Sequence, residues 1–278
     1  MKRAGGGSSS RLLENRVPVR LISWNVNGIR ACTRKGMLKW LAISDAEILG
    51  LQETRAELDE CPEPLRAPHG LAHCAWSAAR SRRGYSGVAL YSVDAPERVE
   101  CSLGIEDYDR EGRFVLAEFP TFLVANVYFP KGSGIDRDNS RVFYKLGFTE
   151  RVFRAMDEWR RATGKGAVVM GDFNIAPTPI DLARPRGNEG TSGFLPEERA
   201  AFARIIESGW VDTFRNSNPD EIRYTWWSQR LGVRDRNIGW RIDHVLVSED
   251  LLPRVRAAHI WDYVRGSDHC PVGIDLEP

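Results

Sequence analysis

The chain has 278 residues and a formal net charge of +1, and its composition is 42% hydrophobic and 28% charged. This length and composition predict one large folded domain with a sizeable core, and they exclude disordered, collagen-like and membrane classes. No apolar segment approaches the roughly 18 residues of a spanning helix, and the N-terminus lacks the apolar stretch of a signal peptide. We therefore expect a soluble cytoplasmic protein without a membrane partner.

The N-terminal segment differs in composition from the rest of the chain. Residues 1–16 combine glycines, serines and scattered basic residues, which predicts a flexible tail followed by one domain over residues 17–278. The five cysteines are an odd number and include no C-x-x-C pair, so we expect reduced thiols and no zinc site.

Short apolar segments bounded by turn-forming residues predict nine strands. In chain order they span residues 19–25, 47–53, 86–92, 113–119, 122–129, 167–174, 224–228, 241–248 and 271–277. Helical periodicity lies between them, at residues 36–42, 140–162 and 196–207, although Gly147 weakens the second helix. Many strands with interspersed helices predict an α/β domain in which sheets pack face to face and are flanked by helices.

Polar side chains recur where these predicted strands end. The candidates are Asn25, Asn27, Glu53, Asp172, Asn174, Asp243, Asp268 and His269. Taken singly, an Asn-Gly or Asp-x-Asn sequence is typical of a capped turn. Their repetition at several strand ends favours one shared polar cleft.

Four of these candidates are acids, and four carboxylates in one cleft repel one another unless a cation or an imidazolium compensates them. This pattern predicts a metal ion. Oxygen ligands without thiolates, and with a single candidate histidine, favour Mg²⁺, with Mn²⁺ as a substitute, over zinc.

Two further features concern aromatic and basic residues. Trp226 and Trp227 are adjacent on a predicted strand, so one side chain can enter the core while the other faces a cleft, although burial of both is equally compatible. Residues 222–241 contain five arginines against a single acid, and a second cluster lies at residues 80–83. These clusters predict local contacts with phosphates despite the near-neutral net charge.

The segments SWNVNGIR, LQET, YFPKGSG, GDFNIAPTPIDL, YTWW, GWRID and GSDHCP closely resemble the exonuclease III family of apurinic/apyrimidinic endonucleases, within the endonuclease/exonuclease/phosphatase superfamily. The resemblance implies a four-layered α/β sandwich of the deoxyribonuclease-I type, with two packed, mainly antiparallel or mixed sheets flanked by helices. It implies a monomeric, Mg²⁺-dependent DNA-repair enzyme. The expected reaction is hydrolysis of the phosphodiester 5′ to an abasic site in duplex DNA, which leaves a 3′-hydroxyl. Exonuclease activity in the 3′ to 5′ direction and 3′-end cleaning are implied as well.

The resemblance also implies residue roles. Glu53, Asp268 and Asn27 correspond to the metal site. Asp172 corresponds to the residue that aligns or deprotonates the attacking water, and Asn174 and Asn25 to its orienting partners. Tyr128 supplies a phosphate-facing hydroxyl, and His269, paired with Asp243, binds the scissile phosphate.

Substrate recognition is implied for two further groups of residues. Trp226, Trp240 and Ile242 correspond to a pocket that accepts a base-free sugar. The family positions near the DNA backbone are Arg30, Tyr85, Lys131, Arg186, Asn188 and Arg230, where Arg230 begins a loop to Arg241 that is expected to lie along phosphates. At three positions this chain departs from residues of the family, with Asn27 in place of the Asp of some relatives, Lys131 in place of Asn or Gln, and His244 in place of Tyr or Phe.

Two alternative functions remain open on the sequence. One is a superfamily phosphatase or phosphodiesterase that acts on lipids or small phosphates, and the other is a DNA-binding module without catalytic activity. The sequence also leaves open the identity of the general base and whether one or two metal ions act.

Overall fold

The computed structural model describes residues 18–134, 136 and 138–277. The predicted tail, residues 1–16, lies outside the described residues. Within the described part of the chain, none of the helices has the length and apolar character needed to cross a membrane.

The first of two large sheets contains six strands in the order β13-β14-β1-β2-β4-β3. Its strands are β1 (Val19–Asn25), β2 (Ile48–Gln52), β3 (His73–Ser77), β4 (Val88–Ser92), β13 (Val255–Ile260) and β14 (Val272–Leu276). Only the central pair β1 and β2 is parallel, and the other neighbours are antiparallel.

The second large sheet repeats this pattern, with the order β5-β6-β7-β8-β12-β9 and one parallel pair, β7 and β8. Its strands are β5 (Arg98–Glu100), β6 (Phe114–Glu118), β7 (Phe122–Tyr128), β8 (Gly166–Asp172), β9 (Trp210–Asp212) and β12 (Asp243–Ser248). A separate two-stranded ribbon joins β10 (Trp226–Trp227) to β11 (Gly239–Trp240).

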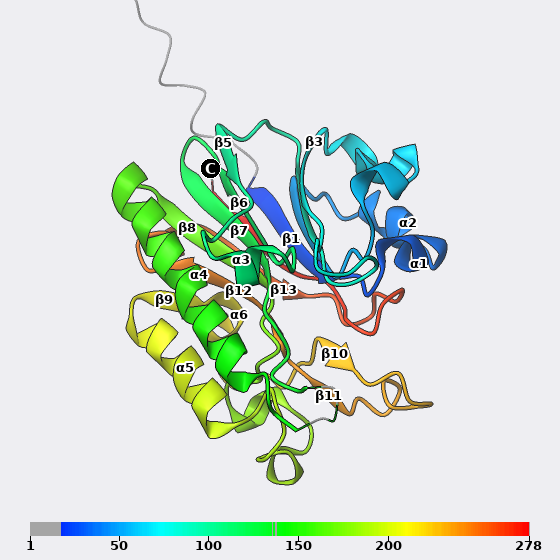
Figure 1. Ribbon diagram of the computed structural model, residues 1–278, viewed down its shortest axis with the longest axis vertical. Helices are drawn as coiled ribbons and strands as arrows, with labels where there is room; N and C mark the ends of the chain where they lie inside the picture. The colour runs from blue at the N-terminus through cyan, green and yellow to red at the C-terminus, as the bar shows by residue number, and fades with distance from the viewer. Residues whose placement is uncertain (1–17, 135, 137, 278) are drawn as a thin grey trace, which may run out of the picture.

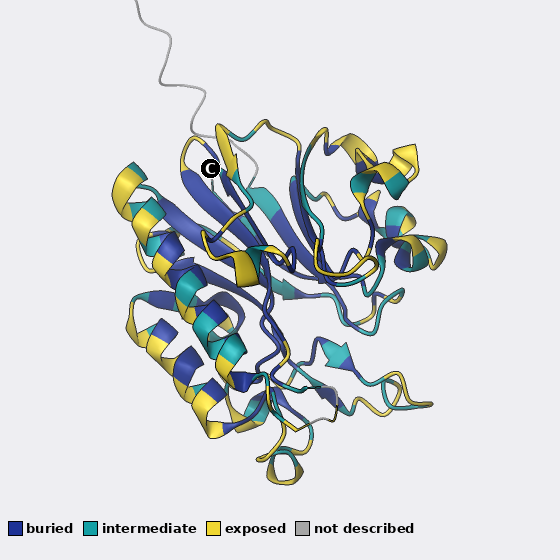
Figure 2. Ribbon diagram, viewed as in Figure 1, coloured by how far each residue is buried: buried dark blue, intermediate teal, exposed yellow. Residues whose placement is uncertain are grey.

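Helices cover the outer faces of both sheets (Figure 1). They are α1 (Ile29–Arg34) and α2 (Met37–Leu41) on the first sheet, and α4 (Val142–Thr163) and α5 (Pro196–Glu207) on the second. Two shorter helices are α3 (Glu106–Asp109) and α6 (Thr213–Ser217), and α6 contacts β12 and β13, one strand from each sheet. One face of α4 and α5 is buried and the opposite face is exposed (Figure 2). Phe148, Met156 and Phe202 on the buried faces pack into an apolar cluster with residues of the second sheet. Burial of such stripes is what stabilises amphipathic helices in a layered fold.

Three apolar clusters account for the layers. The central cluster joins the facing sides of the two sheets, with Leu90 and Val124 among its members. A second lies beneath α4 and α5, and a third lies between the first sheet and helices α1 and α2. The predicted four-layered α/β sandwich with two mixed sheets is therefore confirmed.

The long predicted elements are observed within a few residues of their expected bounds, except the segment 224–228, of which only Trp226 and Trp227 form a strand. Trp227 is buried and Trp226 is partly exposed, so the two side chains have different environments. Gly147 lies inside α4, and a Cβ added there would stand 2.6 Å from the Tyr108 hydroxyl. The glycine that weakens the helical pattern therefore allows Tyr108 of α3 to approach α4 closely.

Register brings the predicted polar residues to one edge of the sandwich. In the first sheet Asn25 pairs with Gln52, the residue before Glu53. In the second sheet Asp172 pairs with Tyr128 on one side and with Asp243 on the other. Parallel strands end at the same edge of their sheet, and β12 begins there because it runs antiparallel to β8.

Candidate active site

Asn25 connects the two sheets at this edge. Its amide Nδ2 donates to Glu53 Oε1 at 3.0 Å and to Asp172 Oδ2 at 2.8 Å. All three residues are at most 3% exposed. One amide group therefore fixes the separation of two carboxylates from different sheets.

The backbone at the strand ends adopts an unusual conformation. Asn27, Glu53 and Asn174 have positive φ angles of 46°, 52° and 52°. Asparagine tolerates this left-handed region better than most residues, whereas a longer residue such as Glu53 is rarely found there. Such conformations concentrate at functional sites, where the surrounding structure holds them in place.

His269 is held by a chain of hydrogen bonds. Its Nδ1 lies 2.8 Å from Asp243 Oδ2, which also accepts a 2.6 Å hydrogen bond from the Thr225 hydroxyl. A carboxylate at Nδ1 requires a proton there, so Nε2 is the nitrogen that faces the cleft, 3.8 Å from Asp172 Oδ2. Burial would lower the pKa of His269, but the carboxylates of Asp243 and Asp172 outweigh it and raise that pKa to about 9.

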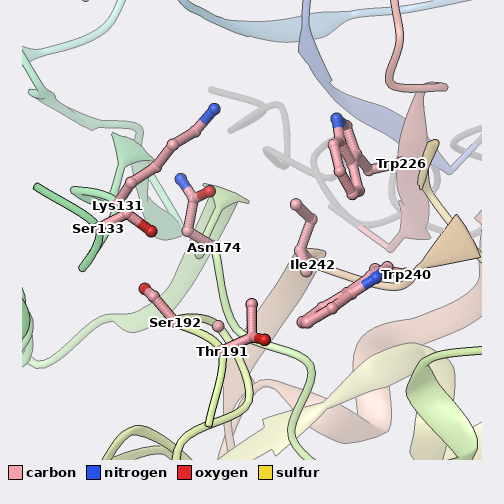
Figure 3. Close-up of a pocket in the computed structure, with 9 residues that line it drawn as sticks. Lys131, Ser133, Asn174, Thr191, Ser192, Trp226, Trp240 and Ile242 are labelled. Carbon is pink, nitrogen blue, oxygen red and sulfur yellow. The ribbon is translucent and has the colours of Figure 1, made fainter. Parts of the chain in front are cut away.

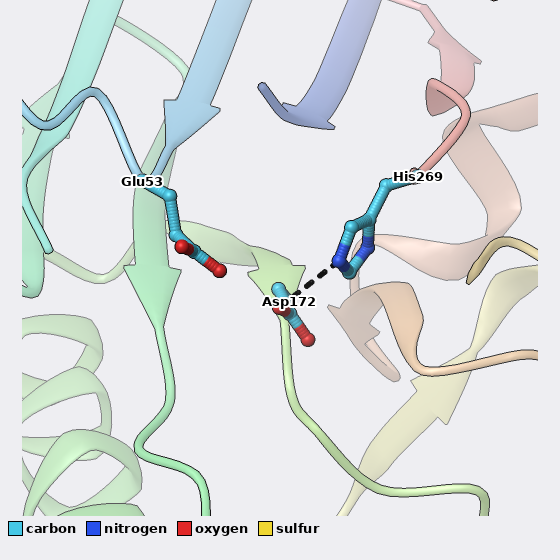
Figure 4. A group of neighbouring side chains, drawn as sticks. All are labelled: Glu53, Asp172 and His269. Carbon is cyan, nitrogen blue, oxygen red and sulfur yellow. Dashed lines mark ion pairs between the residues drawn. The ribbon is translucent and has the colours of Figure 1, made fainter. Parts of the chain in front are cut away.

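Glu53, Asp172 and His269 form a group that can hold a metal ion, because each offers one ligand atom and these atoms lie within 4.8 Å of one another (Figure 4). Burial would raise the pKa of Glu53, but the positive charges of Lys131 and Arg55 hold it near 2. A hard divalent cation prefers such ionised oxygen ligands. Glu53 is therefore the member of this group that is best suited to bind a metal ion.

The environment of Asp172 raises its pKa, whereas that of Glu53 lowers the pKa of Glu53. Burial is the main cause that raises the pKa of Asp172, to about 7, and Asp243 and Glu53 contribute as neighbouring negative charges. Its Oδ1 accepts from the backbone N–H of Asn174 at 2.9 Å, and the Asn174 amide donates to the Phe129 carbonyl at 2.9 Å. A carboxylate held in this way can accept a proton from water near neutral pH.

Asn25, Glu53, Asp172 and His269 form the candidate catalytic edge of the sandwich, and Asp268 joins this catalytic edge to the β10-β11 ribbon. Its Oδ1 accepts from Asn27 Nδ2 at 2.8 Å, and its Oδ2 accepts from the Trp226 indole at 3.2 Å. Burial would raise the pKa of Asp268, but His269 and these two hydrogen bonds lower it. Asn27 thus contacts the second expected metal carboxylate through its amide nitrogen.

Tyr128 lies at the end of β7 beside this cluster and is 6% exposed. Burial and the nearby Glu53 carboxylate raise the pKa of Tyr128 well above its ordinary value. Its hydroxyl therefore stays protonated and can donate a hydrogen bond to an anionic group.

A pocket of about 150 Å³ is lined by Asn174, whose backbone N–H binds Asp172, and by Trp226, whose indole binds Asp268. Figure 3 shows the residues that line it. Trp226, Trp240 and Ile242 form one apolar wall. The other wall is polar and consists of Lys131, Ser133, Asn174, Thr191, Ser192 and Gly193. The structure thus brings together the three residues expected to form a sugar pocket, and Trp226 and Trp240 are opposite each other in the β10-β11 ribbon.

The residues expected near DNA differ in how far they are exposed to solvent. Arg30, Lys131, Arg186 and Arg230 are exposed. Tyr85 is partly buried, and its hydroxyl accepts from Arg113 Nη2 at 2.7 Å. Asn188 is also partly buried and donates to the Arg184 carbonyl at 2.7 Å. Tyr85 and Lys131 line a second hollow beside Glu53, with a volume of about 610 Å³ and with Arg55, Arg82, Arg113 and Arg141 in its walls.

The expectation that the whole Arg230–Arg241 loop lies along phosphates is wrong. Arg241 is 1% exposed and is paired with Asp181 and Asp212, at 2.7 Å and 2.8 Å. Arg234 donates to the backbone carbonyls of residues 262, 264 and 267 and covers the Trp227 ring. These two arginines stabilise the protein interior, so the formal charge of the segment overstates what is available to a ligand.

Several residues of the site were not predicted from the sequence. Thr225 holds Asp243, and Arg55 forms an ion pair with Glu53 and has its Nε 3.0 Å from Glu53 Oε2. Thr191 and Ser192 line the pocket. Thr225 lies within the YTWW segment and Arg55 directly follows the LQET segment, which was the available signal, whereas nothing local marks residues 191 and 192.

Comparisons with known proteins agree with this geometry. The Endonuclease/Exonuclease/phosphatase family matches residues 22–269. An exodeoxyribonuclease of Bacillus subtilis (strain 168) is 42% identical over 259 residues, which cover 91% of this chain and 98% of the relative. The DNA repair nuclease APEX1 of Danio rerio is 36% identical over 260 residues, covering 93% and 82% of the two chains.

Solved structures show the same relationship. An AP endonuclease from Archaeoglobus fulgidus is similar with a TM-score of 0.80 and 30% identity, over 94% of this chain and 100% of that one. The 3′ phosphatase NExo from Neisseria, bound to a product DNA hairpin, is similar with a TM-score of 0.84 and 28% identity, with the same coverage. The catalytic edge, the matched length and these similarities lead to one conclusion: the chain belongs to the Endonuclease/Exonuclease/phosphatase family.

Proposed function

We propose that this protein is a DNA-repair hydrolase that cleaves the phosphodiester 5′ to an abasic site in duplex DNA and leaves a 3′-hydroxyl. The observation that carries the proposal is the small, half-apolar pocket directly beside the buried carboxylate and imidazole cluster. A base-free sugar fits such a pocket, whereas a nucleotide with its base is larger and costs more to unstack. The protein acts as a monomer.

The proposed cofactor is Mg²⁺, with Mn²⁺ as a substitute, bound by Glu53 and Asp268 with Asn27 beside them. Glu53, with its low pKa, is ionised and ready to bind a hard cation. When bound there, a divalent ion would supply charge neutralisation on the phosphate and stabilisation of the leaving 3′-oxygen. In the described part of the chain, the group whose ligand atoms lie within 4.8 Å of one another consists of Glu53, Asp172 and His269 and does not include Asp268.

The protein's own groups supply the remaining chemistry. Asp172 orients the attacking water and accepts its proton, while Asn25 and Asn174 hold the carboxylate in place. His269 carries a proton at Nδ1 toward Asp243 and presents Nε2 to the scissile phosphate. Tyr128 donates its hydroxyl hydrogen to the same phosphate. Preorganised donors of this kind stabilise charge that develops in the transition state.

The proposed activities include removal of nucleotides and blocking groups from 3′ ends. The relative from Bacillus subtilis is an exodeoxyribonuclease, and the structural neighbour from Neisseria is a 3′ phosphatase. Both reactions hydrolyse a phosphate ester at a DNA end, so one catalytic edge can serve all of them.

An abasic oligonucleotide duplex, incubated with Mg²⁺ or with excess EDTA, tests the proposal. We expect a single cut 5′ to the abasic site that requires the metal. Cleavage of the same duplex in excess EDTA would reject the metal dependence, and no cleavage with either Mg²⁺ or Mn²⁺ would reject the function. Hydrolysis of a small phosphate ester in the absence of DNA cleavage would support the phosphatase alternative.

A further inference from the structure

Lys145 on α4 and Glu198 on α5 form an ion pair in which both side chains are fully buried. Lys145 Nζ lies 2.6 Å from Glu198 Oε1, and both side chains are 0% exposed. A buried charge pair contributes little net stability, because desolvation offsets most of the attraction. The contribution of this pair to the protein is therefore better sought in the other groups that Lys145 and Glu198 bind.

Lys145 holds the loop that follows Asp172. Its Nζ donates to the backbone carbonyl of Asn174 at 2.7 Å. Asn174 contributes its backbone N–H to Asp172 and its side chain to the pocket wall. The ammonium group is thus anchored to the residue that is shared by the catalytic edge and the pocket.

Glu198 holds the opposite part of the same wall. Its carboxylate accepts from the backbone N–H groups of Gly193 and Leu195, and from the Ser192 hydroxyl at 3.2 Å. Ser192 and Gly193 line the pocket. One carboxylate therefore fixes the turn that forms the polar wall.

Gly193, in the segment that Glu198 binds, packs closely against Asn174 and Trp240. A Cβ added to Gly193 would stand 3.0 Å from the Asn174 carbonyl oxygen and 3.3 Å from the Trp240 ring. Gly193 also has a φ of +95°, which side chains other than glycine rarely adopt. A small displacement of the 192–195 turn would therefore change the distance between the polar wall and Trp240.

We infer that the Lys145–Glu198 pair is a positioning element that sets the width of the pocket, and thereby its discrimination against nucleotides that carry a base. Neither side chain lines the pocket, so both act through Asn174 and Gly193. The inference rests on the proposed function, because it assigns a cause to the size selection at that site.

The double variant Lys145→Met/Glu198→Gln tests the inference, because it removes both charges together and leaves no uncompensated ion in the interior. We expect the ratio of kcat/KM for abasic over undamaged duplex to fall by about tenfold, since small changes in a pocket have effects of that size. Cleavage of abasic DNA should continue, and the affinity for Mn²⁺ should not change. An unchanged ratio in a folded variant would overturn the inference.

A matched control is the pair of Lys165 with Glu118, whose Nζ and Oε1 lie 2.8 Å apart at the opposite end of β8. Glu118→Gln should leave the ratio at the wild-type value, and an equal fall there would reject a specific role for Lys145 and Glu198. If the double variant does not fold in a thermal melt, Ser192→Ala removes one bond to Glu198 and should lower the ratio by a smaller factor.

A measurement of DNA binding distinguishes failure of this inference from failure of the proposed function. The affinities for an abasic-analogue duplex and for an undamaged duplex are measured in EDTA, where no cleavage is needed. If the double variant loses the preference for the abasic-analogue duplex, the pocket-width inference is supported, even where the wild-type protein does not cleave 5′ to an abasic site. An unchanged preference contradicts the inference.

Discussion

The catalytic edge and the pocket are neighbours, but they are built in different ways. The edge consists of buried polar side chains at the ends of central strands, and hydrogen bonds join Asn25, Glu53 and Asp172 across the two sheets. The pocket consists of loops and a ribbon of two two-residue strands, and Trp226 and Trp240 in its apolar wall are only partly buried. Rigid strands suit chemistry that requires fixed distances, whereas loops can change recognition without moving the reacting groups.

The largest expected effect comes from the catalytic edge. Asp172→Asn should lower kcat for abasic DNA by about 10² to 10⁴, because it removes the proposed proton acceptor while retaining the shape of the side chain. Single-turnover cleavage measures the rate, and fluorescence anisotropy measures DNA affinity, which should stay nearly constant. Asp250→Asn, on the exposed turn after β12, is the control and should cleave like the wild type. Wild-type rates for Asp172→Asn would remove this residue from the mechanism.

Glu53→Gln affects the same edge through the metal. We expect weaker Mn²⁺ binding, measured by titration with electron paramagnetic resonance, because one ionised oxygen ligand of a hard cation is lost. Cleavage should fall in parallel and recover in part at high Mg²⁺. Glu60→Gln, outside the cluster, should bind the metal normally. Normal metal affinity together with slow cleavage would assign Glu53 a role other than metal binding.

Trp240→Ala changes the pocket and leaves the catalytic edge in place. The ratio of abasic to undamaged cleavage should fall by about tenfold or more, because the apolar wall recedes and a larger nucleotide can enter. Truncation of a packed tryptophan can also cost about 3 to 5 kcal/mol, so the variant is first checked by its thermal melt. Equal loss on both substrates, with an unchanged ratio, would show that Trp240 serves packing alone.

The smallest expected effect concerns the exposed rim. Arg230→Ala should make the salt dependence of DNA binding shallower by about 1 in the log-log slope, because one phosphate contact is lost. The control is Arg256→Ala on β13, which removes an exposed arginine that pairs with Glu277. Affinity that does not depend on salt would contradict phosphate contacts at this rim.

Much of this architecture is encoded locally. Apolar segments with turn signals defined the long strands, and strand-end polar residues gave the correct edge, because the side-chain period of a strand and the end of its apolar run are local properties. The short strands β5, β9 and β11 were missed, and so were the longer strands β3 and β13 at the edges of the first sheet, most of whose residues are only partly buried. Elements of two or three residues carry too little periodicity to be recognised, and they exist because neighbouring strands pair with them.

The tertiary structure decided which charged groups face each other. The sequence places Arg230, Arg234 and Arg241 in one basic segment, yet only the fold buries Arg241 between Asp181 and Asp212 and directs Arg234 to backbone carbonyls. Likewise, Lys145 and Glu198 are 53 residues apart and carry no shared motif. A hydrophobic pattern acts between near neighbours in the chain, whereas an ion pair depends on distances in space. The sequence therefore determined the layers and the polar residues at the strand ends, while the packing of α4 and α5 determined which groups hold the polar wall of the pocket.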